Sequence, residues 1–269
     1  MKIALLHYAA QPIVGGVESV ITQHARLMAD DGHQVRVIAG RGEQTDARIA
    51  FHRVPEVDSR HPEVLAVKKE LDAGRIPTAF EPLVERIAAR LLELIGDADR
   101  LIAHNVCSLN KNLALTVALY RISENMASPL VILWHHDLAW TTPRYRGELH
   151  DGYPWDLLRT DWPWVAQVAV SESRRSELAG LIGVSVDRIR VVPNGVDVPQ
   201  FLKLEAGSEA LLRLMQLSSA APLILMPVRI TPRKNVELAL RVLAALRSDF
   251  KEAQLIVTGP LGPHSQTNQ

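Results

Sequence analysis

Residues 3–32 read IALLHYAAQPIVGGVESVITQHARLMADDG, and this stretch sets the fold class. A short apolar run comes first, as is typical of a strand. A glycine pair, Gly15-Gly16, follows it, and the apolar residues of 17–31 then recur at helical spacing. Gly32 suits the left-handed position that ends a helix. The stretch therefore predicts a strand, a glycine turn and a helix.

The same alternation continues along the chain. Its apolar runs are mostly continuous, which indicates strands covered on both faces and hence a parallel sheet built from βαβ units. The predicted strands are 3–7, 35–39, 100–104, 129–134, 165–170, 189–192, 223–228 and 254–258. The predicted helices are 17–31, 81–95, 109–122, 172–182 and 235–247.

Composition excludes several classes of protein. The 269 residues include 30 basic and 30 acidic ones, so there is no basic excess to attract nucleic acid or an anionic membrane. No apolar run reaches the roughly 18 residues of a transmembrane helix, and the N-terminal run is too short for a signal peptide. The single cysteine, Cys107, fits a reducing compartment. We therefore expect a cytoplasmic protein with no transmembrane segment.

The glycine pair is a candidate ligand site. Glycines let backbone N–H groups approach a ligand closely, and a helix N-terminus favours an anion. A plain strand-to-helix turn explains Gly15 and Gly16 about equally well. The spacing is not G-x-G-x-x-G, so a dinucleotide cofactor and a nicotinamide dehydrogenase find little support.

His135-His136-Asp137 directly follows a predicted strand. Ligands of open α/β sheets sit beyond the carboxyl ends of the strands. A histidine there can hydrogen-bond a sugar hydroxyl, and Asp137 can fix its tautomer. Two adjacent histidines diverge after a strand and no third ligand is near in sequence, so we expect no metal site.

Three cations follow the predicted strand 223–228. Arg229, Arg233 and Lys234 stand where a strand meets a helix N-terminus, which suits a diphosphate. Pro232 makes the turn rigid. A solvated basic turn is the alternative.

All five tryptophans lie between residues 134 and 164, in a stretch without clear periodicity. Sugar rings stack on indole rings through apolar contact. Trp140, Tyr145 and Trp155 are therefore candidate acceptor-binding residues. A hydrophobic cluster beneath a long loop explains them about as well.

Together these features resemble the retaining glycosyltransferases of the GT-B fold, specifically glycosyltransferase family 4. The most specific match is IRVVPNGVD at 189–197, which is similar to the family's I-x-V-I-P-N-G-V-D signature. Residues 229–235 look like its R-x4-K-(G/N) element. Further matches, in chain order, are Gly15-Gly16, GHQV at 32–35, His136-Asp137 and AVSES at 169–173.

The resemblance implies two Rossmann-like domains, an acceptor-side domain at 1–198 and part of a nucleotide-sugar-binding domain at 199–269. Arg229 and Lys234 would neutralise the departing diphosphate without a metal. The expected reaction moves a sugar to the hydroxyl of a sugar, lipid or small-molecule acceptor, with retention and without a cofactor. The expected donor-binding residues are Gly15, Gly16, Arg229, Lys234 and Gly259, and His136 is expected at the reacting sugar.

The family also carries a Glu-x7-Glu element late in its C-terminal domain, and none follows Lys234. We therefore expect only the first part of the donor domain in this chain. Two alternatives stay open. One is a non-catalytic module that binds a sugar or a partner. The other is a GT-B-fold nucleotide-sugar epimerase, although no convincing carboxylate pair for acid–base work is present.

Overall fold

The computed structural model describes residues 1–125, 130–196 and 206–259. Contacts divide the chain into two compact units, Met1–Gly195 and Val196–Gln269. The domain boundary expected after residue 198 lies outside the described residues.

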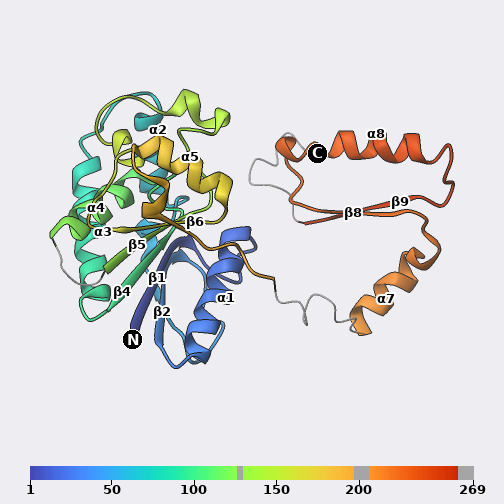
Figure 1. The fold of residues 1–269 in the computed structure, drawn as a ribbon, viewed down its shortest axis with the longest axis horizontal. Helices are drawn as coiled ribbons and strands as arrows, with labels where there is room; N and C mark the ends of the chain where they lie inside the picture. The colour runs from blue at the N-terminus through green and yellow to red at the C-terminus, as the bar shows by residue number, and fades with distance from the viewer. Residues whose placement is uncertain (126–129, 197–205, 260–269) are drawn as a thin grey trace. The chain divides into compact units, whose positions relative to one another are not determined.

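The first unit is built on a seven-stranded parallel sheet with the order β3-β2-β1-β4-β5-β6-β7 (Figure 1). This confirms the predicted α/β fold class, and every strand predicted in this unit is present. One strand, β3, is new, because its short sequence AFHR at the sheet edge has no continuous apolar run. The strands are β1 Lys2–Ala9, β2 Gln34–Arg41, β3 Ala50–Arg53, β4 Arg100–His104, β5 Leu130–His135, β6 Ala166–Ala169 and β7 Ile189–Val191.

Five α-helices of this unit are described, and four of them were predicted. The fifth, α2, was missed because it buries only a narrow stripe, Val64, Val67 and Leu71. The α-helices are α1 Gly16–Asp30, α2 Pro62–Asp72, α3 Phe80–Ile95, α4 Leu113–Asn125 and α5 Glu172–Ile182. Short 3-10 helices are η1 Pro55–Val57, η2 Pro143–Glu148, η3 Trp155–Leu158 and η4 Val186–Arg188.

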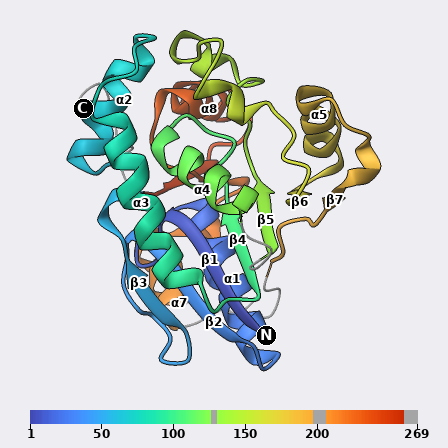
Figure 2. The same cartoon turned by 90° about the vertical axis from the view of Figure 1, so that its left-hand side faces the viewer.

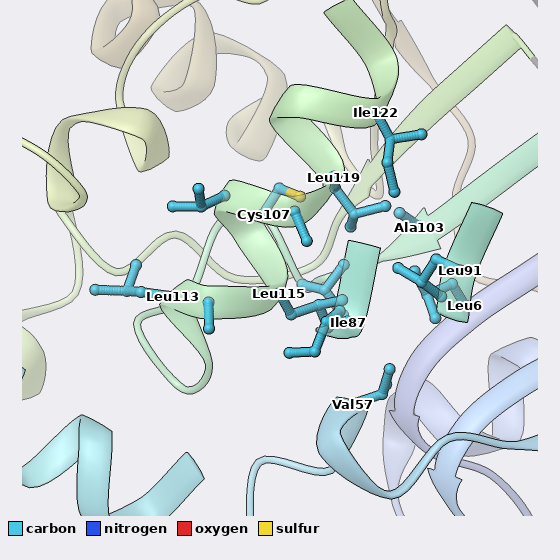
Figure 3. Packing of buried hydrophobic residues seen from close by; sticks show 14 of the residues in the cluster. Leu6, Val57, Ile87, Leu91, Ala103, Cys107, Leu113, Leu115, Leu119 and Ile122 are labelled. Carbon is cyan, nitrogen blue, oxygen red and sulfur yellow. The ribbon is translucent and has the colours of Figure 1, made fainter. Parts of the chain in front are cut away.

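Strand β1 contributes side chains to two separate hydrophobic cores, because successive side chains point to opposite faces of the sheet. Ala4 and Leu6 belong to the larger core with α3 and α4, whereas Ile3 and Leu5 belong to the core with α1. Figures 1 and 2 show α3 and α4 on one side of the strands. Figure 3 shows the larger core, in which Cys107 is enclosed; burial raises the pKa of its thiol. The sheet is therefore held from both faces, as its apolar strands predict.

The second unit contains a parallel strand pair, β8 Leu223–Pro227 and β9 Gln254–Thr258. Helix α8 Val236–Leu246 connects them and confirms the predicted βαβ unit. Helix α7 Ala206–Leu214 precedes β8 and was not among the predicted helices. The remaining short helices are η5 Leu217–Ser219 and η6 Pro232–Lys234. Within the described residues of both units, no helix is long and apolar enough to cross a membrane.

Candidate active site

The carboxyl ends of β1, β4 and β5 meet at one edge of the seven-stranded sheet. From β1 the chain runs outward through β2 to β3 and then returns to the other side of β1 for β4. Such a reversal of strand order is where open α/β sheets bind ligands. His104 and His135 end β4 and β5, His7 lies in β1 shortly before its end at Ala9, and His136 directly follows β5.

The glycine pair opens α1 at this edge. Gly15 caps the helix with extended backbone (φ −173°), and its carbonyl accepts the Ser19 hydroxyl at 2.9 Å. Gly16 is exposed, and a Cβ atom built on it would meet nothing within 4 Å. Neither backbone angle nor packing within the protein demands glycine at position 16, so Gly16 leaves open space at a helix N-terminus.

Asn105 fastens the loop after β5 to the end of β4. Its backbone is left-handed (φ 57°), a conformation that asparagine tolerates better than most residues. The side-chain Oδ1 accepts the backbone N–H groups of His136 at 3.0 Å and Asp137 at 2.9 Å. The Ser108 hydroxyl donates to the same oxygen at 3.1 Å. The backbone at His136 is thereby fixed by a side chain from the neighbouring strand's loop.

Histidines from three elements gather beneath this loop on the α1 face of the sheet. The His104 ring stacks on Trp134 of β5 with a centroid distance of 5.3 Å, and His24 of α1 packs its edge against the same indole at 4.7 Å. His104 Nδ1 lies 3.4 Å from His136 Nε2. His7 Nδ1 donates to the His104 carbonyl at 2.7 Å, which ties β1 to β4. We call these four histidines, 7, 24, 104 and 136, the histidine cluster.

The histidine cluster is uncharged near neutral pH because it is withdrawn from water. Burial lowers the pKa of His7 to about 3 and that of His136 to about 4, although Asp137 opposes the shift at His136. Burial also lowers the pKa of His24 and of His104. Each neutral ring therefore offers one donor and one acceptor nitrogen.

His135 and Asp137 lie apart from this cluster. His135 points to the opposite face of the sheet, where its Nε2 donates to Gln167 Oε1 at 2.7 Å. Asp137, which we expected to orient a histidine, is exposed and lies 4.0 Å from Arg174. Among the described residues no group of three His, Cys, Asp or Glu side chains is arranged to hold a metal ion.

The predicted diphosphate residues lie in the second unit, at the carboxyl edge of β8 and β9. Arg229 follows β8, and Lys234 ends η6. Asn235 then caps α8 as expected, its side chain accepting the Leu238 N–H at 3.3 Å. A Cβ atom on Gly259 would lie 2.5 Å from the Val228 carbonyl oxygen, so the loops after the two strands touch. Gly259 thus has a packing reason to be glycine, while its role in donor binding stays a prediction.

The predicted acceptor residues lie in the larger core. Trp155 is 3% exposed and Tyr145 is 7% exposed. Trp140 is half-buried, and the Arg159 guanidinium carbon lies 3.9 Å from the centre of its ring. This packing matches the alternative of a hydrophobic cluster beneath a long loop. A part in acceptor binding stays a prediction for all three.

Sequence reasoning missed four residues around His136, namely His7, His24, His104 and Asn105. His104 ends the predicted strand 100–104 and Asn105 directly follows it, so the rule for strand ends finds these two.

The sequence model of Glycosyltransferase Family 4 matches residues 14–200 of the chain. The chain belongs to glycosyltransferase family 4. The match includes the glycine pair and the loop that carries His136, whereas His7, Arg229, Lys234 and Gly259 lie outside the matched residues.

The chain is also similar to a named relative over a longer stretch. It is 24% identical over 274 residues to mannosylglucosylglycerate synthase of Thermotoga maritima, a match that covers 95% of this chain and 60% of that protein. The chain thus spans less than two thirds of that relative's length.

Two solved structures share the fold. WaaG, a glycosyltransferase involved in lipopolysaccharide biosynthesis, superposes with a TM-score of 0.63 at 17% identity, covering 97% of this chain and 64% of WaaG. HepE of Anabaena, in complex with UDP and glucose, gives a TM-score of 0.62 at 15% identity, covering 99% of this chain and 63% of HepE. These likenesses confirm the predicted GT-B type of fold.

Proposed function

We propose that the chain is part of a glycosyltransferase that moves a sugar from a nucleotide-sugar donor to an acceptor hydroxyl. The observation that carries the proposal is the family 4 match over residues 14–200, which contains the glycine pair and His136 at the reversal of strand order. A GT-B-fold neighbour, HepE, is named as a complex with UDP and glucose, which favours a nucleotide sugar as donor.

In this proposal, the donor diphosphate is neutralised by Arg229 and Lys234. Fixed cations stabilise the charge that develops on a leaving diphosphate, and they do so without a metal ion. Gly16 leaves room for a donor phosphate or the reacting sugar at the N-terminus of α1. The donor is a substrate, and we propose no cofactor.

His136 stands at the reacting sugar in this proposal. We expect retention of configuration, with the acceptor hydroxyl attacking on the side from which the diphosphate leaves. The name of the Thermotoga maritima relative favours a mannosyl donor and a small, hydrophilic acceptor. The cytoplasmic location remains a proposal that rests on the single cysteine, which fits a reducing compartment.

The test is transfer from a panel of GDP- and UDP-linked mannose and glucose, measured by mass spectrometry with sugar and glycerate acceptors. It is run on the 269-residue chain and on the longest gene product that contains it. We expect transfer with the anomeric configuration of the donor retained, and unchanged rates after treatment with EDTA. Arg229→Ala and Lys234→Ala should each lower the rate by about a hundredfold or more.

Other outcomes identify the alternatives. Sugar binding in calorimetry without nucleotide binding would indicate a non-catalytic module. Conversion of the nucleotide sugar in the absence of any acceptor would indicate an epimerase. Transfer that is unchanged in both variants would remove the roles of Arg229 and Lys234.

A further inference from the structure

One contact of the histidine cluster bears directly on His136. His104 Nδ1 faces His136 Nε2 at 3.4 Å, and both rings are neutral near neutral pH. One of the two nitrogens must therefore donate and the other accept. The direction of this hydrogen bond decides which nitrogen of His136 carries its proton.

The surroundings of His104 decide that direction. Its other nitrogen, Nε2, is enclosed and has no hydrogen-bond partner among the residues that the structure describes. The whole residue is 0% exposed. A proton on Nε2 would be a buried donor without an acceptor, which costs the full desolvation of an N–H group. The proton of His104 therefore belongs on Nδ1, where it points at His136.

His104 is itself held in place. Its ring stacks on Trp134, the register partner of His104 across β4 and β5. Its carbonyl accepts the Nδ1–H of His7 from β1. His24 covers the remaining side with a ring distance of 5.4 Å. His104, the hydrogen-bond donor, thus sits on a central strand of the sheet, and its ring has little freedom to turn away from His136.

We propose that His104 is a positioning residue that keeps the proton of His136 on Nδ1, so that His136 serves substrate as a hydrogen-bond donor. His104 Nδ1–H donates to His136 Nε2, which leaves Nδ1–H of the partly exposed His136 ring to meet a sugar or phosphate oxygen. A general base at this nitrogen is excluded by the same assignment, because the nitrogen that faces substrate already holds a proton. The substrate side of this inference rests on the proposed function, whereas the tautomer does not.

The tautomer can be measured without any enzyme activity. Long-range 1H–15N spectra of the 15N-labelled chain at pH 7.5 distinguish an imidazole protonated on Nδ1 from one protonated on Nε2. We expect His136 to be the Nδ1–H form, whereas free histidine favours Nε2–H. A dominant Nε2–H form of His136 in the unmodified chain would overturn the proposal.

Two substitutions of similar size separate the hydrogen bond from packing. In His104→Asn the amide nitrogen falls near the former Nδ1, so the donor is kept; in His104→Gln it falls near the former Nε2, so the donor is lost. We expect His136 to stay Nδ1–H in H104N and to shift towards Nε2–H in H104Q. An unchanged tautomer in H104Q would overturn the proposal, as would the same shift in both variants.

A matched control comes from the opposite face of the sheet. His135→Gln keeps a donor near the former Nε2 for Gln167 and should leave the tautomer of His136 unchanged. If a His104 variant fails to fold, as seen by circular dichroism, the tautomer of the unmodified chain still decides.

Activity provides a separate readout. If transfer is found, H104Q should lower kcat by about tenfold, the effect of one ordinary hydrogen bond, with little change in the KM for donor. H104N should recover most of that loss. Absence of transfer in every form, with the Nδ1–H tautomer present, would count against the proposed function and leave the positioning role intact.

Discussion

The side-chain oxygen of Asn105 accepts the backbone N–H of His136 at 3.0 Å, across the loops that end two neighbouring strands. It also accepts the N–H of Asp137, and Asn105 itself is left-handed. With the Ser108 hydroxyl as a third donor, one residue therefore supplies both an unusual backbone conformation and an acceptor for three hydrogen bonds.

Substitutions at Asn105 should separate these two contributions. Asn105→Gly keeps the backbone but loses the acceptor, at a cost of about 1–2 kcal/mol in the free energy of unfolding. Asn105→Ala loses the same acceptor and also holds alanine in the left-handed conformation, which costs about 1 kcal/mol more. Asn105→Asp keeps both and should change stability least. Urea denaturation measures the series, and equal stability of the Gly and Ala variants would contradict the role of the backbone.

The free energy of unfolding should fall as the pH drops below about 6.5. In this range histidines bind protons in the unfolded chain, whereas the buried histidines of the folded chain stay neutral. The folded pKa values of His7, His135 and His136 are lowered to about 3, 4 and 4. The three histidines therefore cost no stability above pH 6.5, and their cost grows as the pH falls towards 4. Each histidine adds a slope of about 1.4 kcal/mol per pH unit in that window.

His7→Asn isolates the contribution of His7 to the pH dependence of stability. Its amide nitrogen can still donate to the His104 carbonyl, but it does not titrate. Thermal melts between pH 7 and pH 5 should show a shallower decline for this variant. A melting temperature that is independent of pH in the unmodified chain would refute the prediction. The window lies above the ordinary pKa values of carboxyl groups, so their titration interferes little.

Gly16 and Gly259 should respond oppositely to alanine. A Cβ atom at Gly259 would clash with the Val228 carbonyl at a backbone angle (φ +136°) that suits glycine only. Gly259→Ala should therefore destabilise the second unit by about 1–3 kcal/mol, seen as lost hydrogen-exchange protection in β8 and β9. Gly16→Ala meets no atom within 4 Å and should melt normally while binding nucleotide sugar more weakly. Normal donor affinity in Gly16→Ala would show that the ligand does not approach that backbone.

Trp155 and Trp140 should also differ. Trp155 is enclosed, so Trp155→Ala should cost about 3–5 kcal/mol of stability. Trp140 is half-buried beside Arg159, so Trp140→Ala should be milder. If the acceptor stacks on an indole, Trp140→Ala should raise the KM for acceptor. An unchanged acceptor KM would leave the aromatic stretch with a structural role alone.

The sheet was predictable because strands buried on both faces are continuous apolar runs, as in β1 and β4. Strand β3 at the sheet edge and the narrow stripe of α2 carry a weaker signal, and both were missed. The rule for strand ends also predicted that His136 and the glycine pair lie at the carboxyl edge of the sheet, where the structure has them, whereas their roles stay predictions.

The contact between His104 and His136 could not be predicted in the same way. The contact requires that β4 lies beside β5 with His104 opposite Trp134. The pattern of apolar residues predicts neither the order of the strands nor their register. The sequence also could not predict whether the aromatic residues contact a sugar or fill the core. An indole that stacks on a sugar and one that is buried have the same local sequence.

The central position of β1 has a consequence for synthesis of the chain. Ile3 pairs with Arg100, and β1 finds its second neighbour only when β4 is available. At about 5–20 residues per second, the ribosome takes roughly 5–20 s to make the intervening chain. During that interval β1 has one unpaired strand edge, and the apolar face that later packs on α3 and α4 lacks its full cover. The period of greatest exposure to aggregation therefore comes early in translation, before the candidate active site exists.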